Sequence, residues 1–93
     1  MRRKNYLNFA DTPNNGLYTE HHENGQKKLE GNFKDGNQIG KWILWYKNGQ
    51  KEWEIYFKDG KEHGKGTNWG FQGQLHQRLI YIDGFCVKQT KYI

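Results

Sequence analysis

The chain has 93 residues, of which 33% are hydrophobic, 16% aromatic and 27% charged. Two domains do not fit into this length, and the aromatic content is too high for a disordered chain of this charge. Fifteen Lys and Arg residues against ten Asp and Glu residues give a net charge of +5, which favours an acidic partner such as a protein face, phospholipid or nucleic acid.

The N-terminal part of the sequence does not predict an export signal. The basic residues 2–4 are not followed by the apolar run of a signal peptide, and no later segment approaches the ~20 apolar residues of a membrane span. We expect residues 1–15 to form an N-terminal cap or edge strand, with residues 6–9 as the candidate strand. These features predict a soluble protein that stays in the cytoplasm.

From residue 16 onwards the sequence repeats every 24 residues. Asp35, Asp59 and Asp83 keep this step, and each is followed by Gly. Self-similarity at a fixed period is the signature of a repeat architecture, and the ends of such arrays are atypical. The predicted divisions after the N-terminal cap are three repeats, 16–39, 40–63 and 64–87, and a C-terminal tail, 88–93.

Each repeat contains two short strands separated by Asn-Gly or Asp-Gly, the dipeptides typical of tight hairpin turns. Helices are disfavoured because glycine recurs often and the apolar residues are β-branched and aromatic at period two. The sequence therefore predicts an all-β fold: a single-layer twisted antiparallel meander of stacked β-hairpins, with about six or seven strands.

Two-residue turns would fix which residues face each other across the strands. The expected pairs are Tyr46 with Lys51, Leu44 with Trp53, Trp42 with Ile55, Leu29 with Trp42, Ile55 with Gly64, Trp53 with Gly66, and Gly66 with Leu79. Large rings are expected to lie over Gly64 and Gly66. One face then collects an apolar stripe: Tyr18, Leu29, Phe33, Trp42, Leu44, Trp53, Ile55, Phe57, Leu79 and Tyr81.

The opposite face mixes ordinary charged positions with a second apolar group. The charged and polar positions include Thr19, Lys28, Glu30, Glu52 and Glu54. The apolar group comprises Ile43, Trp45, Tyr56, Trp69, Ile80 and Ile82. A single sheet can cover only one of its faces by its own curl, so this second group must be exposed or covered by something else.

Four segments resemble the MORN repeat: ENGQK at 23–27, FKDG at 33–36, KNGQK at 47–51 and FKDGKEHGKG at 57–66. The similarity is closest to the shorter bacterial form found in YwqK-like antitoxins, and it covers about residues 16–87. This resemblance implies a curved single-layer sheet of stacked hairpins with aromatic side chains along its groove. It also implies association with protein or membrane lipid and no common enzymatic activity.

No group of residues has the spacing of a catalytic or metal site. His21 and His22 are adjacent, so on a strand they point to opposite faces and cannot bind one metal together. Glu52 and Glu54 share a face about 7 Å apart, but nearby lysines favour solvated charges. Cys86 is the only cysteine, which excludes an intramolecular disulfide and fits a reducing compartment. The sequence predicts no enzyme, no metal and no cofactor.

We expect a non-catalytic module that binds a protein partner, such as a toxin or another enzyme that it would inhibit. Aromatic anchors are predicted because Trp and Tyr dominate interface energetics, and lysines would steer the partner. The predicted partner-binding residues are Trp45, Trp69, Tyr56, Phe71 and Ile43, with Lys28, Lys41 and Lys65 as steering charges.

Three alternatives to a foreign protein partner are open. A homodimer formed through one face would bury the same rings. Single-stranded nucleic acid could stack on the aromatic side chains, but basic residues spread along the chain disfavour it. An anionic membrane could attract the lysines, but the sequence has neither an amphipathic helix nor a lipidation motif.

Overall fold

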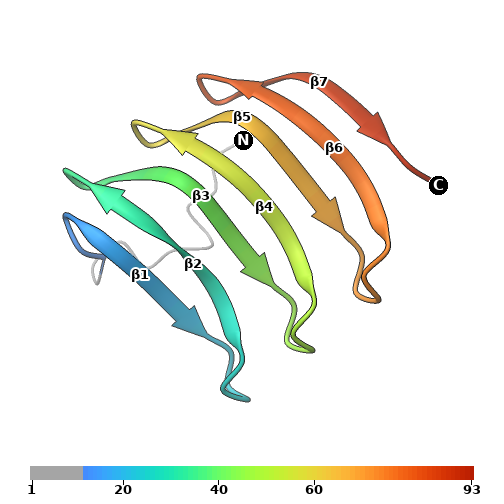
Figure 1. Ribbon diagram of the computed structural model, residues 1–93, viewed down its shortest axis with the longest axis horizontal. Coiled ribbons are helices and arrows are strands. Elements are labelled where there is room, and N and C mark those ends of the chain that lie inside the picture. The colour runs from blue at the N-terminus through green and yellow to red at the C-terminus, as the bar shows by residue number, and fades with distance from the viewer. Residues whose placement is uncertain (1–11) are drawn as a thin grey trace.

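The chain forms one seven-stranded antiparallel sheet in which the strand order follows the chain order (Figure 1). The computed structural model describes residues 12–93. The strands are β1 (Gly16–His21), β2 (Lys27–Lys34), β3 (Asn37–Trp45), β4 (Lys51–Lys58), β5 (Lys61–Trp69), β6 (Leu75–Ile82) and β7 (Phe85–Lys91). The predicted all-β meander of stacked hairpins is confirmed. Residues 12–93 contain no helix that could cross a membrane.

The two ends of the array differ in what the structure describes. Of the predicted N-terminal cap, residues 12–15 precede β1 without forming a strand, and the candidate strand at residues 6–9 lies outside the described residues. At the other end, residues 88–91 belong to β7 and are not a separate tail. β7 starts at Phe85, inside the third repeat, so the last hairpin continues past the predicted repeat boundary.

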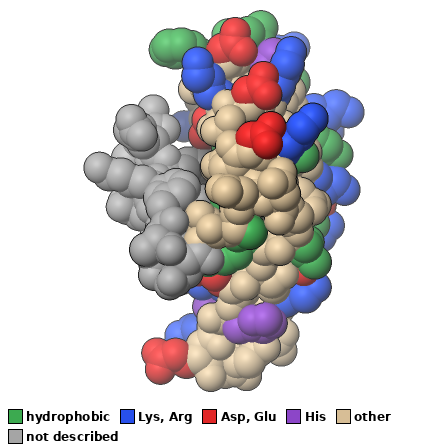
Figure 2. Space-filling model, turned by 90° about the vertical axis from the view of Figure 1, so that its left-hand side faces the viewer, with side chains coloured by type: hydrophobic (Ala, Val, Ile, Leu, Met, Phe, Trp, Pro, Cys, Tyr) green, Lys and Arg blue, Asp and Glu red, His purple; other side chains and the backbone are tan. Residues whose placement is uncertain are grey.

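The Asp-Gly turns are the tight two-residue loops that the sequence predicts. Lys34 pairs with Asn37 across the first of them, with Asp35 at φ 51° and Gly36 at φ 80°. Positive φ at both central residues defines the type I′ turn, whose twist matches that of the flanking strands. These turns lie along one edge of the array, and Figure 2 looks onto this side, where acidic and basic side chains lie next to one another.

The Asn-Gly turns are one residue longer than predicted. The Tyr46 amide donates to the Gln50 carbonyl (2.8 Å), and the Gly49 amide donates to the Tyr46 carbonyl (3.0 Å). This is a three-residue loop ending in a glycine bulge, with Gly49 at φ 89°. The predicted pairing of Tyr46 with Lys51 is therefore wrong, because the extra loop residue sets Lys51 opposite Trp45 instead.

Two further predicted registers are wrong by two residues. Between two successive ladder pairs β2 covers two residues and β3 covers four, so β3 contains two extra residues near Gly40. β5 contains two extra residues near Gly64 relative to β4 in the same way. Positive φ at these glycines, 68° and 99°, lets the backbone accommodate the bulge. The observed pairs are Leu29 with Leu44, Ile55 with Gly66, and Trp53 with Asn68, in place of Leu29 with Trp42, Ile55 with Gly64, and Trp53 with Gly66.

The remaining pairs and the core stripe are confirmed. Leu44 faces Trp53, Trp42 faces Ile55, and Gly66 faces Leu79. A shift of two residues leaves every side chain on its predicted face because strand side chains alternate with period two. The buried side chains are Leu29, Phe33, Trp42, Leu44, Ile55, Phe57, Leu79 and Tyr81, with Tyr18 and Trp53 half-buried against them.

Bare backbone under large rings lets this thin core pack closely. A Cβ at Gly31 would overlap the indole ring of Trp42, and a Cβ at Gly66 would lie 2.9 Å from a ring carbon of Tyr81. Gly64, predicted beneath a ring, instead lies near the Cβ of Tyr56. The Trp42 ring meets Phe33 edge-on at 5.1 Å between centroids, a favourable aromatic geometry.

Side chains also connect each Asn-Gly turn to the next turn along the array. The Asn24 amide donates to the Lys47 carbonyl (2.7 Å), and the Asn48 amide repeats this contact with the Phe71 carbonyl (2.8 Å). At the Asp-Gly edge the direction is reversed: the Gly60 amide donates to the carbonyl of Gln38 (3.0 Å) in the hairpin before it. These bonds hold neighbouring hairpins in register beyond the strand ladders.

Candidate interaction surface

The face opposite the core is built in rows, because cross-strand partners share a face of a sheet. We call it the outer face. Its longest row runs across all seven strands: Thr19, Glu30, Ile43, Glu54, Thr67, Arg78 and Thr90. The shorter rows include Lys41 with Tyr56; Lys65 with Ile80 and Lys88; Ile82 with Phe85; Leu17 with Asn32 and Ile39; Trp45 with Lys51; and Trp69 with Leu75.

Trp45 and Trp69 end β3 and β5, and both are half-buried. The ammonium nitrogen of Lys27 lies 5.7 Å from the Trp45 ring centroid, and that of Lys51 lies 5.9 Å from the Trp69 ring centroid. Both distances fall within the range of cation–π attraction. The two predicted anchors are therefore held by lysines of the preceding hairpin, and their rings are less exposed than the sequence suggests.

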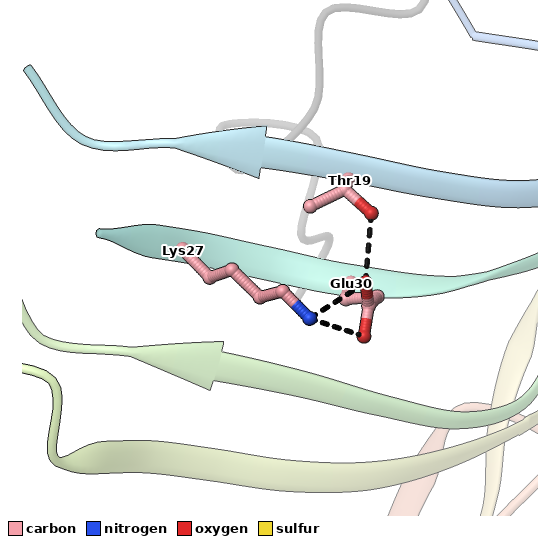
Figure 3. Close-up of polar contacts among 3 residues, drawn as sticks. All are labelled: Thr19, Lys27 and Glu30. Atoms are coloured by element: carbon pink, nitrogen blue, oxygen red, sulfur yellow. Dashed lines mark hydrogen bonds and ion pairs between the residues drawn. The ribbon is translucent and has the colours of Figure 1, made fainter. Parts of the chain in front are cut away.

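The same two lysines also form ion pairs on their own strands. Lys27 Nζ lies 3.1 Å from Glu30 Oε2, and Thr19 Oγ1 donates to the same oxygen at 2.9 Å (Figure 3). Lys51 pairs with Glu54 in the next repeat. The hydrogen bond from Thr19, followed by the hydrogen bond and charge of Lys27, holds the pKa of Glu30 below its ordinary value.

Sequence reasoning missed Lys27 and Lys51 as part of this surface. A tight Asn-Gly turn would place Lys51 on the core side with Leu44, whereas the longer loop places it opposite Trp45. The signal that could have identified both lysines is their spacing, because Lys27 to Trp45 and Lys51 to Trp69 are each 18 residues.

Ile43, Tyr56 and Lys41 lie together at the centre of the outer face. Ile43 is half-buried between Glu30 and Glu54 of the neighbouring strands. Tyr56 keeps 38% of its surface exposed and faces Lys41, which is exposed. The structure therefore brings these three predicted residues into one patch.

The other predicted residues lie apart from this centre. Lys28 is exposed at the bulge between β1 and β2 and has no cross-strand partner in the register. Lys65 lies beside Ile80 on the outer face. Phe71 lies in the turn between β5 and β6, 48% exposed, with its ring centroid 5.3 Å from that of Tyr46.

A second set of exposed apolar side chains gathers on the last hairpin. Ile80 and Ile82 of β6 are 38% and 50% exposed, and Phe85 and Val87 of β7 are 57% exposed or more. Phe85 shares the outer face with its partner Ile82. Sequence reasoning missed Phe85 and Val87 because the equivalent positions of the second repeat are the polar residues Lys61 and His63.

Residues 12–93 contain no cluster of three His, Cys, Asp or Glu side chains that could hold a metal ion. Burial raises the pKa of Glu52, with an opposing effect from the charge of His22. Glu54, which shares a strand with Glu52, is instead neutralised by Lys51. Cys86 is an exposed free thiol.

Comparisons of the chain with protein-family models, with curated proteins and with solved structures found no match. The outer face itself presents exposed apolar side chains in rows, in which Tyr56 faces Lys41 and Ile80 faces Lys65 and Lys88.

Proposed function

We propose that the protein is a non-catalytic, MORN-like β-hairpin repeat module that binds a partner protein through its outer face, in the manner of an antitoxin-like or inhibitory protein. The supporting observation is the uncovered apolar surface on that face: Tyr56 and Ile80 are each 38% exposed and Ile82 is 50% exposed. The core lies on the other face, so folding does not require these side chains to stay apolar. Exposed apolar side chains gathered on one uncovered face of a sheet are typical of an interaction site.

The centre of the outer face has the composition of an interface anchor. Tyr56 presents a ring and a hydroxyl next to the aliphatic Ile43, and the exposed Lys41 lies across the strand from it. Truncating an anchor of this type costs about 2 kcal/mol of binding free energy, or roughly a thirtyfold loss of affinity. Lysines at the rim, such as Lys65, would raise the association rate with an acidic partner.

The lysines that contact Trp45 and Trp69 prepare the two rings for binding. A ring already held by a cation loses less conformational freedom when a partner covers it, and preorganisation of this kind improves affinity. A reducing cytoplasm as the site of action fits the exposed free thiol of Cys86.

A matched pair of tyrosine variants tests this function. Tyr56 is 38% exposed on the outer face, and Tyr92 is 41% exposed beyond β7. Tagged wild-type protein, Tyr56→Ser and Tyr92→Ser would serve as baits in extracts of the native cell, followed by quantitative mass spectrometry. We expect a stoichiometric partner that is retained by wild type and Tyr92→Ser and lost by Tyr56→Ser.

Three outcomes would contradict the proposal. A partner captured equally by all three baits would place the binding site elsewhere. A doubled mass in light scattering at micromolar concentration, with Tyr56→Ser monomeric, would make the outer face a homodimer interface. Salt-dependent binding of single-stranded oligonucleotides or of anionic vesicles, lost in Tyr56→Ser, would assign it to nucleic acid or to a membrane.

A further inference from the structure

The third repeat reverses the charge pattern of the first two on the outer face. Where the first two repeats have the ion pairs Lys27–Glu30 and Lys51–Glu54, the third has Leu75 and Arg78 at the equivalent positions. Arg78 is exposed, and its cross-strand neighbours are Thr67 and Thr90. The position that holds a paired glutamate in the first two repeats is thus occupied by a cation, Arg78, in the third.

Two more cations lie beside the same spot. Ile80 has Lys65 opposite it on β5 and Lys88 opposite it on β7, and Arg78 lies two residues before it on β6. Within residues 12–93, Glu30 and Glu54 of the outer face pair with Lys27 and Lys51, and Lys65, Arg78 and Lys88 form no ion pair. An apolar patch ringed by unneutralised cations favours an anionic partner over a neutral one.

β7 offers an open edge next to this patch. It is hydrogen-bonded to β6 on one side and is the outer strand of the described sheet. All seven of its residues are exposed, with Phe85 at 75% and Val87 at 57%. An outer strand of this kind presents a row of backbone donors and acceptors that can pair with another extended chain.

We propose that an extended acidic segment of a partner protein adds to β7 as a further antiparallel strand. Its backbone would pair with the open edge of β7, its carboxylates would meet Lys88 and Arg78, and its apolar side chains would cover Phe85 and Ile82. The inference rests on the proposed function in that the partner is a protein, and it adds the chemistry and the strand geometry of the contact.

A second copy of this chain fits the β7 edge poorly. Two fully overlapped β7 strands related by a two-fold axis would bring Lys88 of one copy directly against Lys88 of the other, and like charges across strands are destabilising. β1 and β7 run in the same direction in this seven-stranded antiparallel sheet. A translated copy would therefore join β1 to β7 in parallel, the less stable pairing.

Short synthetic peptides test the proposal directly. The probe is a fluorescent peptide of alternating glutamate and valine, about eight residues long as in a typical strand, with a lysine–valine peptide as its control. We expect the acidic peptide to bind the full chain, more tightly at about 50 mM than at about 300 mM salt, and the basic peptide not to bind. NMR amide exchange should show new protection along β7 on binding, which a peptide lying flat across the outer face would not give.

A charge-reversed double variant with a matched control locates the contact. R78E/K88E should weaken binding of the acidic peptide by roughly tenfold or more. K34E/K58E makes the same change in net charge at the ends of β2 and β4, away from β7, and should retain the wild-type affinity. Because all four side chains are exposed, both variants are expected to fold, which far-UV circular dichroism verifies.

The proposal is overturned by any of four results. These are no binding of the acidic peptide, equal binding of the two peptides, equal loss in both double variants, or binding without protection of β7 amides. Binding of anionic vesicles that depends on Arg78 and Lys88, without peptide binding, would assign the surface to a membrane. A cellular partner that depends on Tyr56, combined with no peptide binding, would overturn this inference and leave the proposed function standing.

Discussion

Two carboxylates on the same sheet respond to their surroundings in opposite ways. Glu30 accepts hydrogen bonds from Thr19 and Lys27, which favour its charged form. Glu52 is half-buried, and desolvation disfavours its charged form. Because a change in pKa on folding makes the free energy of unfolding depend on pH, the two residues should change this free energy in opposite directions as the pH falls.

Because the pKa of Glu30 is lower in the folded protein, acidification protonates this carboxylate in the unfolded chain at a higher pH than in the folded protein. Its contribution to stability is therefore complete above its ordinary pKa of 4.5 and is lost as the pH falls through the lower folded value. We expect Glu30→Gln to be less stable than wild type at neutral pH, with the difference shrinking towards about pH 3. Urea unfolding across this range measures it.

Glu52→Gln is the matched comparison for Glu30→Gln. Because burial raises the pKa of Glu52, its charge costs stability at neutral pH, and this cost is relieved as the pH falls through the folded pKa. Glu52→Gln should therefore be more stable than wild type at neutral pH and lose this advantage in acid. The same sign of change in both variants would contradict the two environments described above.

Gly31 shows how closely the core packs at the level of one atom. A methyl group at this position would overlap the indole of Trp42, which is 1% exposed and cannot move outward. We expect Gly31→Ala to lower the free energy of unfolding by about 1–3 kcal/mol, the usual cost of overpacking. Asn32→Ala, one residue along and exposed, should change it by less than about 0.5 kcal/mol in the same denaturant titration.

At the scale of the strand and the turn, the two turn types have different tasks. The Asp-Gly turns set register through two residues with positive φ, for example Asp59 at 49° and Gly60 at 84°. The Asn-Gly turns place one more residue in the loop and thereby change which side chains reach the outer face. Turn chemistry thus determines the composition of the interaction surface.

Gly60→Ala tests the Asp-Gly turn. An alanine in the left-handed backbone conformation that glycine adopts freely destabilises the fold by roughly 1–2 kcal/mol. Its Cβ would also lie 3.1 Å from Asn37 Oδ1. We expect a loss of stability of this size by thermal or urea unfolding. Gly60→Asn should recover part of it because asparagine tolerates this region. Equal stability of the two variants would argue against a turn with positive φ.

Much of the fold was predictable because the turn dipeptides and the alternation of apolar residues agree. The core stripe from Leu29 to Tyr81 followed from these two signals alone. The bulges near Gly40 and Gly64 were not predictable, because extra strand residues leave no mark on an alternating pattern when they come in pairs. The one-residue change at Asn48-Gly49 mattered more, since it moved Lys51 to the outer face and created its contact with Trp69.

At the scale of the whole molecule, the sheet is thin and its stability is unevenly distributed. The described chain measures 39 × 34 × 18 Å along its principal axes. The fully buried side chains, Leu29, Trp42 and Ile55, belong to β2, β3 and β4, whereas every residue of β7 is exposed. Local opening should therefore start at the β7 end of the array.

Native-state hydrogen exchange measures this gradient. We expect amides of β3 and β4 to exchange most slowly and those of β7 to exchange fastest, because local stability follows burial and contact density. Uniform protection from β2 to β7 would show instead that the array unfolds as one unit. Addition of the acidic peptide should slow β7 selectively, which separates stabilisation by a partner from a general effect on the fold.

The bonds between successive turns make the array modular in steps of one repeat. The Asn24 amide reaches forward to the next turn, and the Gly60 amide reaches back to the hairpin before it. A duplicated or excised unit of 24 residues would leave each donor opposite an equivalent acceptor, whereas a strand insertion whose length is not a multiple of 24 would separate them. Gene duplication can thus lengthen such a chain, and the binding surface with it, without designing a new contact.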